Sequence, residues 1–331
     1  MTRASRNAGA ALLMAMLTVA LVATFAAAAL WQQWRSVEVE AAERARVQSS
    51  WILTGALDWA RLLLREDGRA GGADHLGEPW AVPLQEARLS SFLAADRNTT
   101  AESGPEVLEA FLSGQIVDMQ SLLNVNALVD ATGRISDTDV RSFERLFELL
   151  GLPPAQLDQL IENMRFAADT SANNRSGPMA ALLPQRVEEL VWLGLPPASV
   201  AALQPYITVL PARQGTPINL NTASAEVIYA AVDELSMADA QRLVAVREQA
   251  PFTSVLAARD AIGAPDAMFA PGQVNVAVAS GFFEVRARLR LDQLVVEERS
   301  LVQRSGIDVR TLQRERGVAD PAALAQAAAR R

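Results

Sequence analysis

An uncharged apolar run from Ala10 to Trp31 constrains the fold of this chain more than any other feature. A helix over this run is about 33 Å long at ~1.5 Å per residue, enough to cross the ~30 Å hydrocarbon core of a bilayer. Because Arg3 and Arg6 precede it, the N-terminus is predicted to be cytoplasmic, with the rest of the chain across the membrane. The alternatives are a plain single-span anchor and a cleaved secretory signal, for which Ala26–Ala29 offers a cleavage site.

The sequence beyond the run favours an anchor that continues into a folded domain. Residues 32–66 contain no proline and a single glycine, Gly55, so one helix is predicted over residues 10–66. Apolar residues recur at three- and four-residue steps in its second part, which predicts a face that packs on a domain. The glycines that follow are predicted to end the helix: Gly68, Gly71 and Gly72.

The composition excludes several classes of catalytic and metal site. The chain has no cysteine and one histidine, His75, and its 30 cationic residues are all arginine. It therefore lacks disulfides, thiolate metal sites, a cysteine nucleophile and a Schiff-base lysine. His75 falls in a predicted loop, where a surface role is expected. The net charge of -8 argues against general nucleic-acid binding. We expect no enzymatic activity and no cofactor.

Strands are predicted on both sides of a long helical stretch. After a short helix over residues 106–112, the run 114–129 predicts one or two short strands. From Phe283 to Leu291 apolar and polar residues alternate, which predicts a half-buried antiparallel strand paired with residues 294–304. A C-terminal tail is predicted over residues 306–331, frayed from Val318 onward. The polar face of the alternating strand is interpreted as a solvated sheet surface. It carries Arg286, Arg288 and Arg290.

The intervening residues 135–270 are predicted to form a helical domain with an internal repeat. The sequence LLGLPPAQL at Leu149–Leu157 recurs as WLGLPPASV at Trp192–Val200. In each copy one helix is predicted to end at glycine and the next to begin at the Pro-Pro pair. We interpret the copies as two related helical units; a recurrent stop signal without common origin is the alternative.

Residues 218–263 are similar to a helix–hairpin–helix module, at Asn219–Ala223 and at Arg247, Pro251 and Phe252. Such modules bind DNA phosphates through a glycine-rich hairpin. Here the hairpin is Asp233–Met237, which has two carboxylates and no glycine. The segment is therefore interpreted as structural, with no nucleic-acid partner. A membrane-anchored DNA-binding or DNA-uptake protein is the alternative function.

The densest group of carboxylates consists of Asp130, Asp137 and Asp139. Its spacing does not match an EF-hand loop, whose glycine comes sixth and whose bidentate glutamate comes twelfth. Asp139 is instead predicted to cap a helix that begins at Val140. This group is not predicted to bind a metal.

The N-terminus resembles a type IV pilin-like leader, in which a short basic segment and a glycine precede an apolar helix. The resemblance implies that residues 1–9 are a leader, that a prepilin peptidase cuts between Gly9 and Ala10, and that the new N-terminus is methylated. Most such proteins have glutamate at the fifth mature position, where this chain has Met14. That buried carboxylate needs the N-terminal amine of the subunit above it as a partner. Met14 cannot serve such a neighbour, which predicts a position at a filament tip.

Most of residues 1–305 resemble the type II secretion system minor pseudopilin K family. Besides the leader and Met14, five stretches carry the resemblance: Gly77–Leu84, Asp118–Leu128, Glu188–Gly194, Asn219–Ser224 and Ser280–Val285. The implied fold is α+β, with a long transmembrane and spine helix, a pilin-like antiparallel sheet and a large inserted all-α domain of SAM-like or helix–hairpin–helix-like units. Residues 67–134 and 271–305 would supply the two parts of the sheet.

The resemblance also implies a function and a location. With pseudopilins I and J, the family forms a complex at the tip of the periplasmic pseudopilus. This complex nucleates pseudopilus assembly in the inner membrane, so the chain is expected to be single-pass with a periplasmic C-terminal domain.

Members of this family can bind calcium in the helical domain. The corresponding region here offers one carboxylate, Asp169, with Asn173 and Asn174 as further oxygen ligands. Calcium takes six to eight oxygens, mostly from carboxylates, so these residues are weak candidates and no metal is expected.

Overall fold

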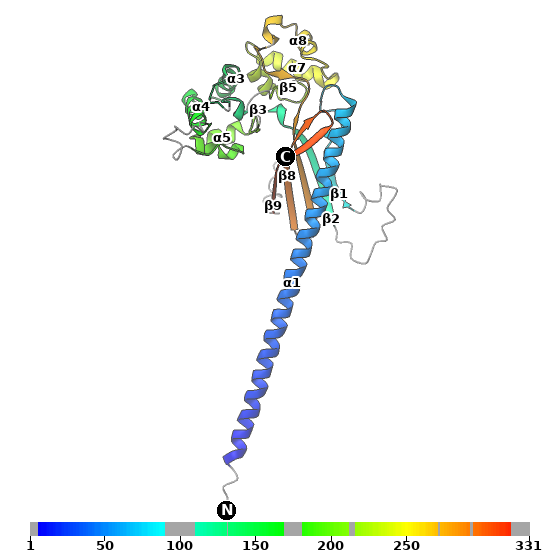
Figure 1. Ribbon diagram of the computed structural model, residues 1–331, viewed down its shortest axis with the longest axis vertical. Helices are drawn as coiled ribbons and strands as arrows, with labels where there is room; N and C mark the ends of the chain where they lie inside the picture. The colour runs from blue at the N-terminus through cyan, green and yellow to red at the C-terminus, as the bar shows by residue number, and fades with distance from the viewer. Residues whose placement is uncertain are drawn as a thin grey trace, which may run out of the picture.

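A long helical stalk carries a head made of a sheet and a helical domain (Figure 1). This computed structural model describes residues 6–89, 110–130, 132–168, 181–211, 216–270, 272–291 and 294–318, with side chains from Ala10 onward. The head lies at the end of the stalk opposite the N-terminus (Figure 1). The mixed α+β architecture and the long N-terminal helix are as predicted.

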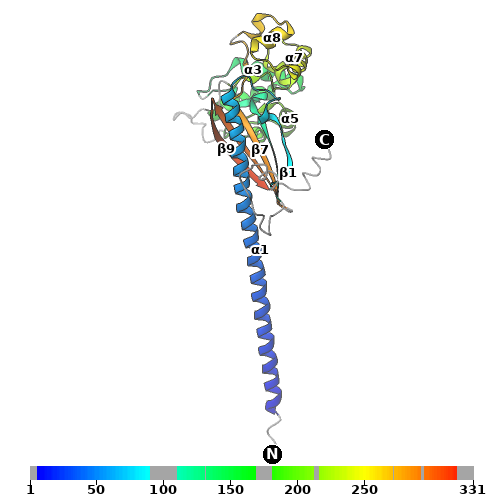
Figure 2. The ribbon, with the colours of Figure 1, turned by 90° about the vertical axis from the view of Figure 1, so that its right-hand side faces the viewer.

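Helix α1 (Arg6–Ala70) runs without interruption for 65 residues. Its first part projects away from the head, and its last part packs on the sheet, as Figure 2 shows. The side chains buried there recur at three- and four-residue steps, as predicted for the packed face. They include Leu53, Leu57, Ala60 and Leu64.

The prediction that Gly68 ends this helix is wrong. The helix continues to Ala70 and ends before Gly71, which has a φ of 67°. Gly68 is instead a point of close approach, because a Cβ atom there would collide with the carbonyl oxygen of Gly306 in the turn between the last two strands. The glycine therefore allows the end of α1 to touch the sheet.

The sheet has five antiparallel strands in the order β1-β2-β7-β8-β9. They are β1 (Leu84–Arg88), β2 (Ala110–Asp118), β7 (Phe282–Leu291), β8 (Leu294–Ser305) and β9 (Asp308–Val318). Helix α1 covers one face of the sheet (Figure 2). The alternation predicted for β7 is confirmed, because Phe283, Val285 and Leu289 are at most 5% exposed and face the core.

Two predictions about strands are wrong. Residues 110–112 lie in β2 instead of a helix, because Ala110 and Leu112 pair with β7 and bury their side chains in the sheet, which overrides local helix propensity. The predicted tail begins with strand β9 instead of irregular chain. Two arginines of β9, Arg314 and Arg316, donate to the buried carboxylate of Glu298 on the neighbouring strand β8, at 2.6 Å each.

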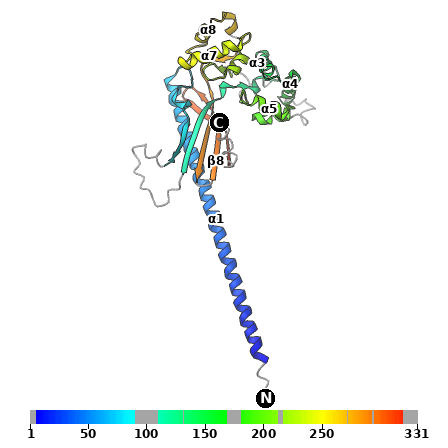
Figure 3. The same cartoon turned by 180° about the vertical axis from the view of Figure 1, so that it is seen from behind.

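The helical domain is inserted between β2 and β7 and has one core (Figure 3). Its helices are α3 (Asp137–Leu149), α4 (Pro154–Ala168), α5 (Pro197–Leu203), α6 (Ala225–Ala231), α7 (Met237–Gln249) and α8 (Val255–Ile262), with a 3₁₀ helix η5 (Val187–Leu193). Two short parallel pairings close it, which the sequence did not predict. They join β3 (Leu123–Asn124) to β4 (Ile207–Thr208) and β5 (Ile218–Asn219) to β6 (Val276–Ala277).

The internal repeat has the predicted turn geometry. Gly151 and Gly194 have φ of 65° and 91°, and α4 and α5 begin at the second proline of each pair. The two copies differ because the second begins with 3₁₀ helix η5. Equivalent positions meet, since Ser199 Oγ donates to Gln156 Oε1 at 2.7 Å. The copies thus pack against each other, which favours paired units over a coincidental stop signal.

Candidate functional site

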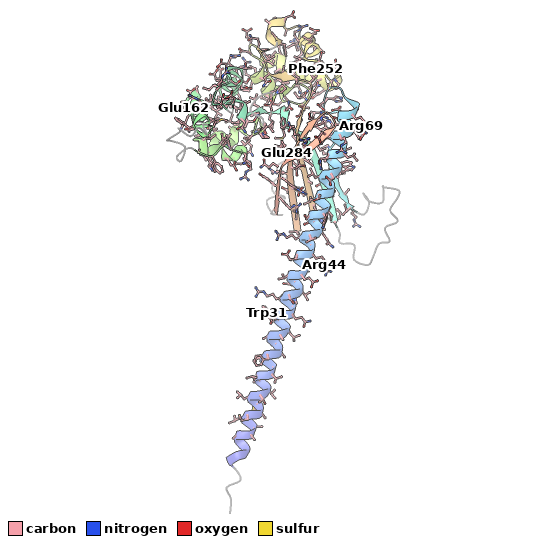
Figure 4. All side chains as sticks on the ribbon, in the orientation of Figure 1. Trp31, Arg44, Arg69, Glu162, Phe252 and Glu284 are labelled. Carbon is pink, nitrogen blue, oxygen red and sulfur yellow. The ribbon has the colours of Figure 1, made fainter. Side chains whose placement is uncertain are left out.

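The projecting part of α1 is apolar and has no packing partner among the described residues. Large side chains from Leu12 to Trp31 are exposed, Met14 by 66%. Among the described residues, α1 is the one helix long and apolar enough to cross a membrane, with a mean hydropathy of 2.3 in its most apolar window. Trp31, labelled in Figure 4, ends this run, and its ring lies 5.6 Å from that of Trp34 at a tilt of 51°, where the bilayer interface is expected. Gly9 and Ala10 lie within α1 at its other end.

A buried polar junction, centred on Asp118 at the end of β2, joins the sheet to the helical domain. Asp118 Oδ2 accepts hydrogen bonds from Asn219 Nδ2 at 3.1 Å, and from Thr222 Oγ1 and Ser280 Oγ at 2.6 Å each. Its Oδ1 accepts the amide of Gln120 at 2.8 Å. Burial raises the pKa of Asp118, and these four donors oppose the rise. The carboxylate therefore holds together segments that are far apart in the sequence.

A second carboxylate extends the junction to the end of α1. Asp74, in the loop after α1, accepts the Ser280 amide at 2.6 Å and Arg304 Nη2 at 2.5 Å, and its carbonyl oxygen accepts Asn219 Nδ2 at 3.1 Å. Arg304 also pairs with Asp67 of α1. Burial raises the pKa of Asp74, while the Ser280 amide and Arg304 oppose the rise. The stalk, the sheet and the helical domain are thus fixed at one point.

Four of the five stretches that carry the family resemblance meet at or beside this junction. Asp118–Leu128 supplies Asp118 itself, Asn219–Ser224 supplies Asn219 and Thr222, and Ser280–Val285 supplies Ser280. The fourth, Gly77–Leu84, supplies Trp80, which packs edge-on against Phe283 with ring centroids 5.1 Å apart. This convergence was not predicted from the sequence. The available signal was polar residues recurring within these otherwise apolar stretches.

The predicted arginine stripe lies on the exposed sheet face, away from α1, but each arginine is paired. Arg286 pairs with Glu284, labelled in Figure 4, while Arg288 Nε donates to Glu297 at 2.7 Å. Arg290 Nε donates to Glu86 at 2.8 Å and its guanidinium stacks over Phe111. The stripe is therefore a charge-balanced surface.

The hairpin of the helix–hairpin–helix-like segment packs on its own domain. Arg145 of α3 donates to the carbonyl oxygens of Tyr229 and Leu235 at 3.0 and 2.7 Å, and the Asp233 carboxylate lies 3.9 Å from the same guanidinium. Glu234 adopts a left-handed φ of 61° in the hairpin. Asp233 of the hairpin is thus held beside Arg141 and Arg145 of α3 in the same domain.

The predicted cap of α3 is wrong by one turn. The helix begins at Asp137 with Ser136 as its N-cap, whose Oγ donates to Asp139 Oδ2 at 2.6 Å and accepts the Asp139 amide. Asp139 is therefore the third helical residue, in the position that closes a capping box. Asp130 forms a turn. Its Oδ1 accepts the Thr132 hydroxyl at 2.7 Å and the amides of Arg134 and Thr132 at 2.9 and 2.8 Å, and these hydrogen bonds, that of the hydroxyl first, lower its pKa.

The weak calcium candidates Asp169, Asn173 and Asn174 lie outside the described residues. Among the described residues, three carboxylates come within 4.8 Å of one another, those of Asp67, Asp74 and Glu78. The guanidinium of Arg304 is bound to two of them, so the chain supplies its own cation there.

Comparison with known proteins agrees with the fold and the sequence motifs. Two family models described as "Type II secretion system (T2SS), protein K" match residues 121–212 and 218–278. Type II secretion system protein K of Pseudomonas aeruginosa is 28% identical over 92% of this chain and 88% of its own length. That of Pectobacterium carotovorum is 27% identical over 95% of this chain and 97% of its own length.

A solved structure has the same architecture. It is a chain from the crystal structure of the GspK-GspI-GspJ complex from the enterotoxigenic Escherichia coli type 2 secretion system. The TM-score is 0.64 at 18% sequence identity, with 84% of this chain and 99% of that chain covered.

Proposed function

Because this chain belongs to the type II secretion system protein K family, we propose that it caps the tip of the periplasmic pseudopilus. As a minor pseudopilin, it would act there with pseudopilins I and J. The tip complex would promote assembly of the pseudopilus for export of folded proteins across the outer membrane.

Met14 is the observation that carries the tip position. In a helical filament of such subunits, the glutamate at this position accepts the N-terminal amine of the subunit above, and both charges are buried in apolar surroundings. Met14 is apolar and offers no partner, so a subunit stacked above would leave a buried amine unpaired, which costs several kcal/mol. The helical domain supports the same position, because α7 and α8 lie beyond the end of α1 that is farthest from the N-terminus, while α4 and α5 lie to the side (Figure 3).

The processing and location of the chain follow from its N-terminal anchor. In this proposal a prepilin peptidase removes residues 1–9, Ala10 becomes the methylated N-terminus, and residues 10–31 cross the inner membrane once. The head then lies in the periplasm. The proposed role is assembly, with no catalytic step and no cofactor.

Co-purification of the full-length chain with pseudopilins I and J tests the capping role. A stable complex of all three proteins is expected. A chain that remains monomeric in the presence of both pseudopilins would refute the capping role. The intact mass of the membrane-extracted chain should place its N-terminus at Ala10, whereas a start near Leu30 would indicate signal peptidase.

A Met14→Glu substitution tests the tip position separately. Restoring the carboxylate should allow other subunits to stack above this one and should change pseudopilus length in electron micrographs. An unchanged length would contradict the argument from Met14.

A further inference from the structure

A cleft of about 360 Å³ lies between the helical domain and the last two strands of the sheet. Pro184, Val209 and Pro211 line it from the helical domain, while Leu301 of β8 and Leu312 of β9 line it from the sheet. A single water needs only ~10–15 Å³, so the cleft has room for several residues of a peptide. Its mostly apolar lining favours apolar side chains as the occupant.

A bulge in the edge strand β9 directs Leu312 to this cleft. The register of β8 and β9 shifts between Leu301 and Val302, because Val302 pairs with Thr311 whereas Leu301 pairs with Gln313. Leu312 is therefore an extra residue in β9, and bulges of this kind turn a side chain away from its regular position. Leu312 is 42% exposed and lines the cleft instead of packing in the core.

Asn126 contributes an acceptor that has no donor. The residue lines the cleft and is 8% exposed. Its Nδ2 donates to the carbonyl oxygen of Leu210 at 2.8 Å, which fixes the orientation of the side-chain amide. Its Oδ1 is buried and accepts no hydrogen bond among the described residues. Because buried polar atoms are nearly always paired in native proteins, this oxygen indicates that a donor is missing at the cleft.

We propose that the cleft receives residues 322–331 of this chain, folded back along β9, with alanine side chains against the apolar lining and a main-chain N–H donating to Asn126 Oδ1. These residues lie outside the described part of the chain. Strand β9 ends at Val318, and 13 residues follow it in the sequence. Leu312 lies six residues before Val318, ~20 Å along the strand, and ten extended residues reach ~33 Å, so the segment is long enough.

The sequence after β9 fits this path. Asp320 and Pro321 form a dipeptide that favours a turn. The residues that follow read AALAQAAARR, and their mostly small side chains suit a narrow cleft. Because the segment is attached to the strand that lines the cleft, its local concentration is high and a few contacts suffice. The segment would join the sheet to the helical domain at a second place, besides the junction around Asp118.

Cross-linking tests the position of this segment, because the chain has no cysteine of its own. The full-length chain with Leu312→Cys and Ala327→Cys is treated with a short bis-maleimide, and the joined peptides are identified by mass. Thr311→Cys with Ala327→Cys is the matched control, because Thr311 is adjacent in sequence but pairs with Val302, which faces α1. The monomeric cross-link should form with a yield roughly tenfold above that of the control.

Equal yields for the two pairs would overturn the inference, because they would show a segment that is not held at the cleft. Cross-links confined to dimers would also overturn it, because the occupant would then be a second copy of the chain.

Removal of the segment gives a measurement that needs no substitution in β9. A chain that stops at Val318 is compared with the full-length chain by hydrogen exchange. The amides of Asn126 and Leu210, both bonded to Asn124 Oδ1, should exchange at least ~fivefold faster without the segment. The amide of Leu112 in β2 is the control and should be unchanged. Equal exchange of Asn126 and Leu210 in both chains would overturn the inference and would mean that water alone occupies the cleft.

Discussion

Replacement of Asp118 by alanine should uncouple the two parts of the head. The carboxylate accepts four hydrogen bonds and is 3% exposed, so its removal leaves buried donors without an acceptor. Two donors keep an alternative: the Thr222 hydroxyl lies 3.4 Å from the Asn219 carbonyl oxygen, and the Asn219 amide still reaches the Asp74 carbonyl oxygen. The Gln120 amide and the Ser280 hydroxyl lose their acceptor. At ~1–3 kcal/mol for each, the expected loss in unfolding free energy is about 4 kcal/mol.

Urea unfolding of the full-length chain in detergent, followed by circular dichroism, measures this loss. Asp58→Ala is the control, because Asp58 is an exposed carboxylate on α1 that pairs with Arg61 one turn away; its unfolding free energy should change by less than ~0.5 kcal/mol. Hydrogen exchange should show faster opening of β5 and of the turn after β2 in Asp118→Ala. A loss below ~1 kcal/mol would refute the reasoning, because it would mean that the freed donors find other acceptors.

The remaining predictions concern the pH dependence, the turns, the core and metal removal. Burial raises the pKa of Asp118 from 3.8, so its contribution to stability is complete below that pH and falls as the pH rises through the folded pKa; Asp118→Asn should therefore cost more at pH 3.5 than at pH 7 in urea titrations. Gly194→Ala should lower the melting temperature more than Gly151→Ala, because both have positive φ but only at Gly194 would the new Cβ lie 2.8 Å from Gln159 Nε2. Trp80→Ala should cost ~3–5 kcal/mol by calorimetry or urea unfolding, since the indole is 1% exposed. Calcium chelation should leave the melting temperature unchanged; a fall that added calcium reverses would show a metal site.

Sequence periodicity predicted the parts of the fold that depend on local pattern. The second part of the helix over 10–66 and the alternating strand β7 each bury one side of a regular element, and that regularity is visible in the residues themselves. The strands at 110–112 and 308–318 were missed for a physical reason. Residues 110–112 form a strand because they pair with β7. Residues 308–318 form a strand beside β8, where the buried Glu298 pairs with Arg314.

The candidate site also has one part that a contiguous sequence motif predicts and one part that only the tertiary structure brings together. The anchor could be predicted without a structure, and the proposed cleavage position and Met14 belong to the same contiguous stretch of sequence. The junction could not, because Asp118 meets Asn219 and Ser280 across 101 and 162 residues of chain. Its members were recognisable as parts of family motifs, but their common partner was visible only once the topology placed the end of β2 beside β5 and the start of β7.

The continuity of α1 has a mechanical consequence. A helix of 65 residues without proline is about 98 Å long, and its end is bonded through Asp67 and Arg304 to the sheet. An axial or rotational displacement of α1 at the membrane would therefore be transmitted along the helix to the head. In the proposed tip position, the head would rise and turn by the same increment each time a subunit is added beneath it.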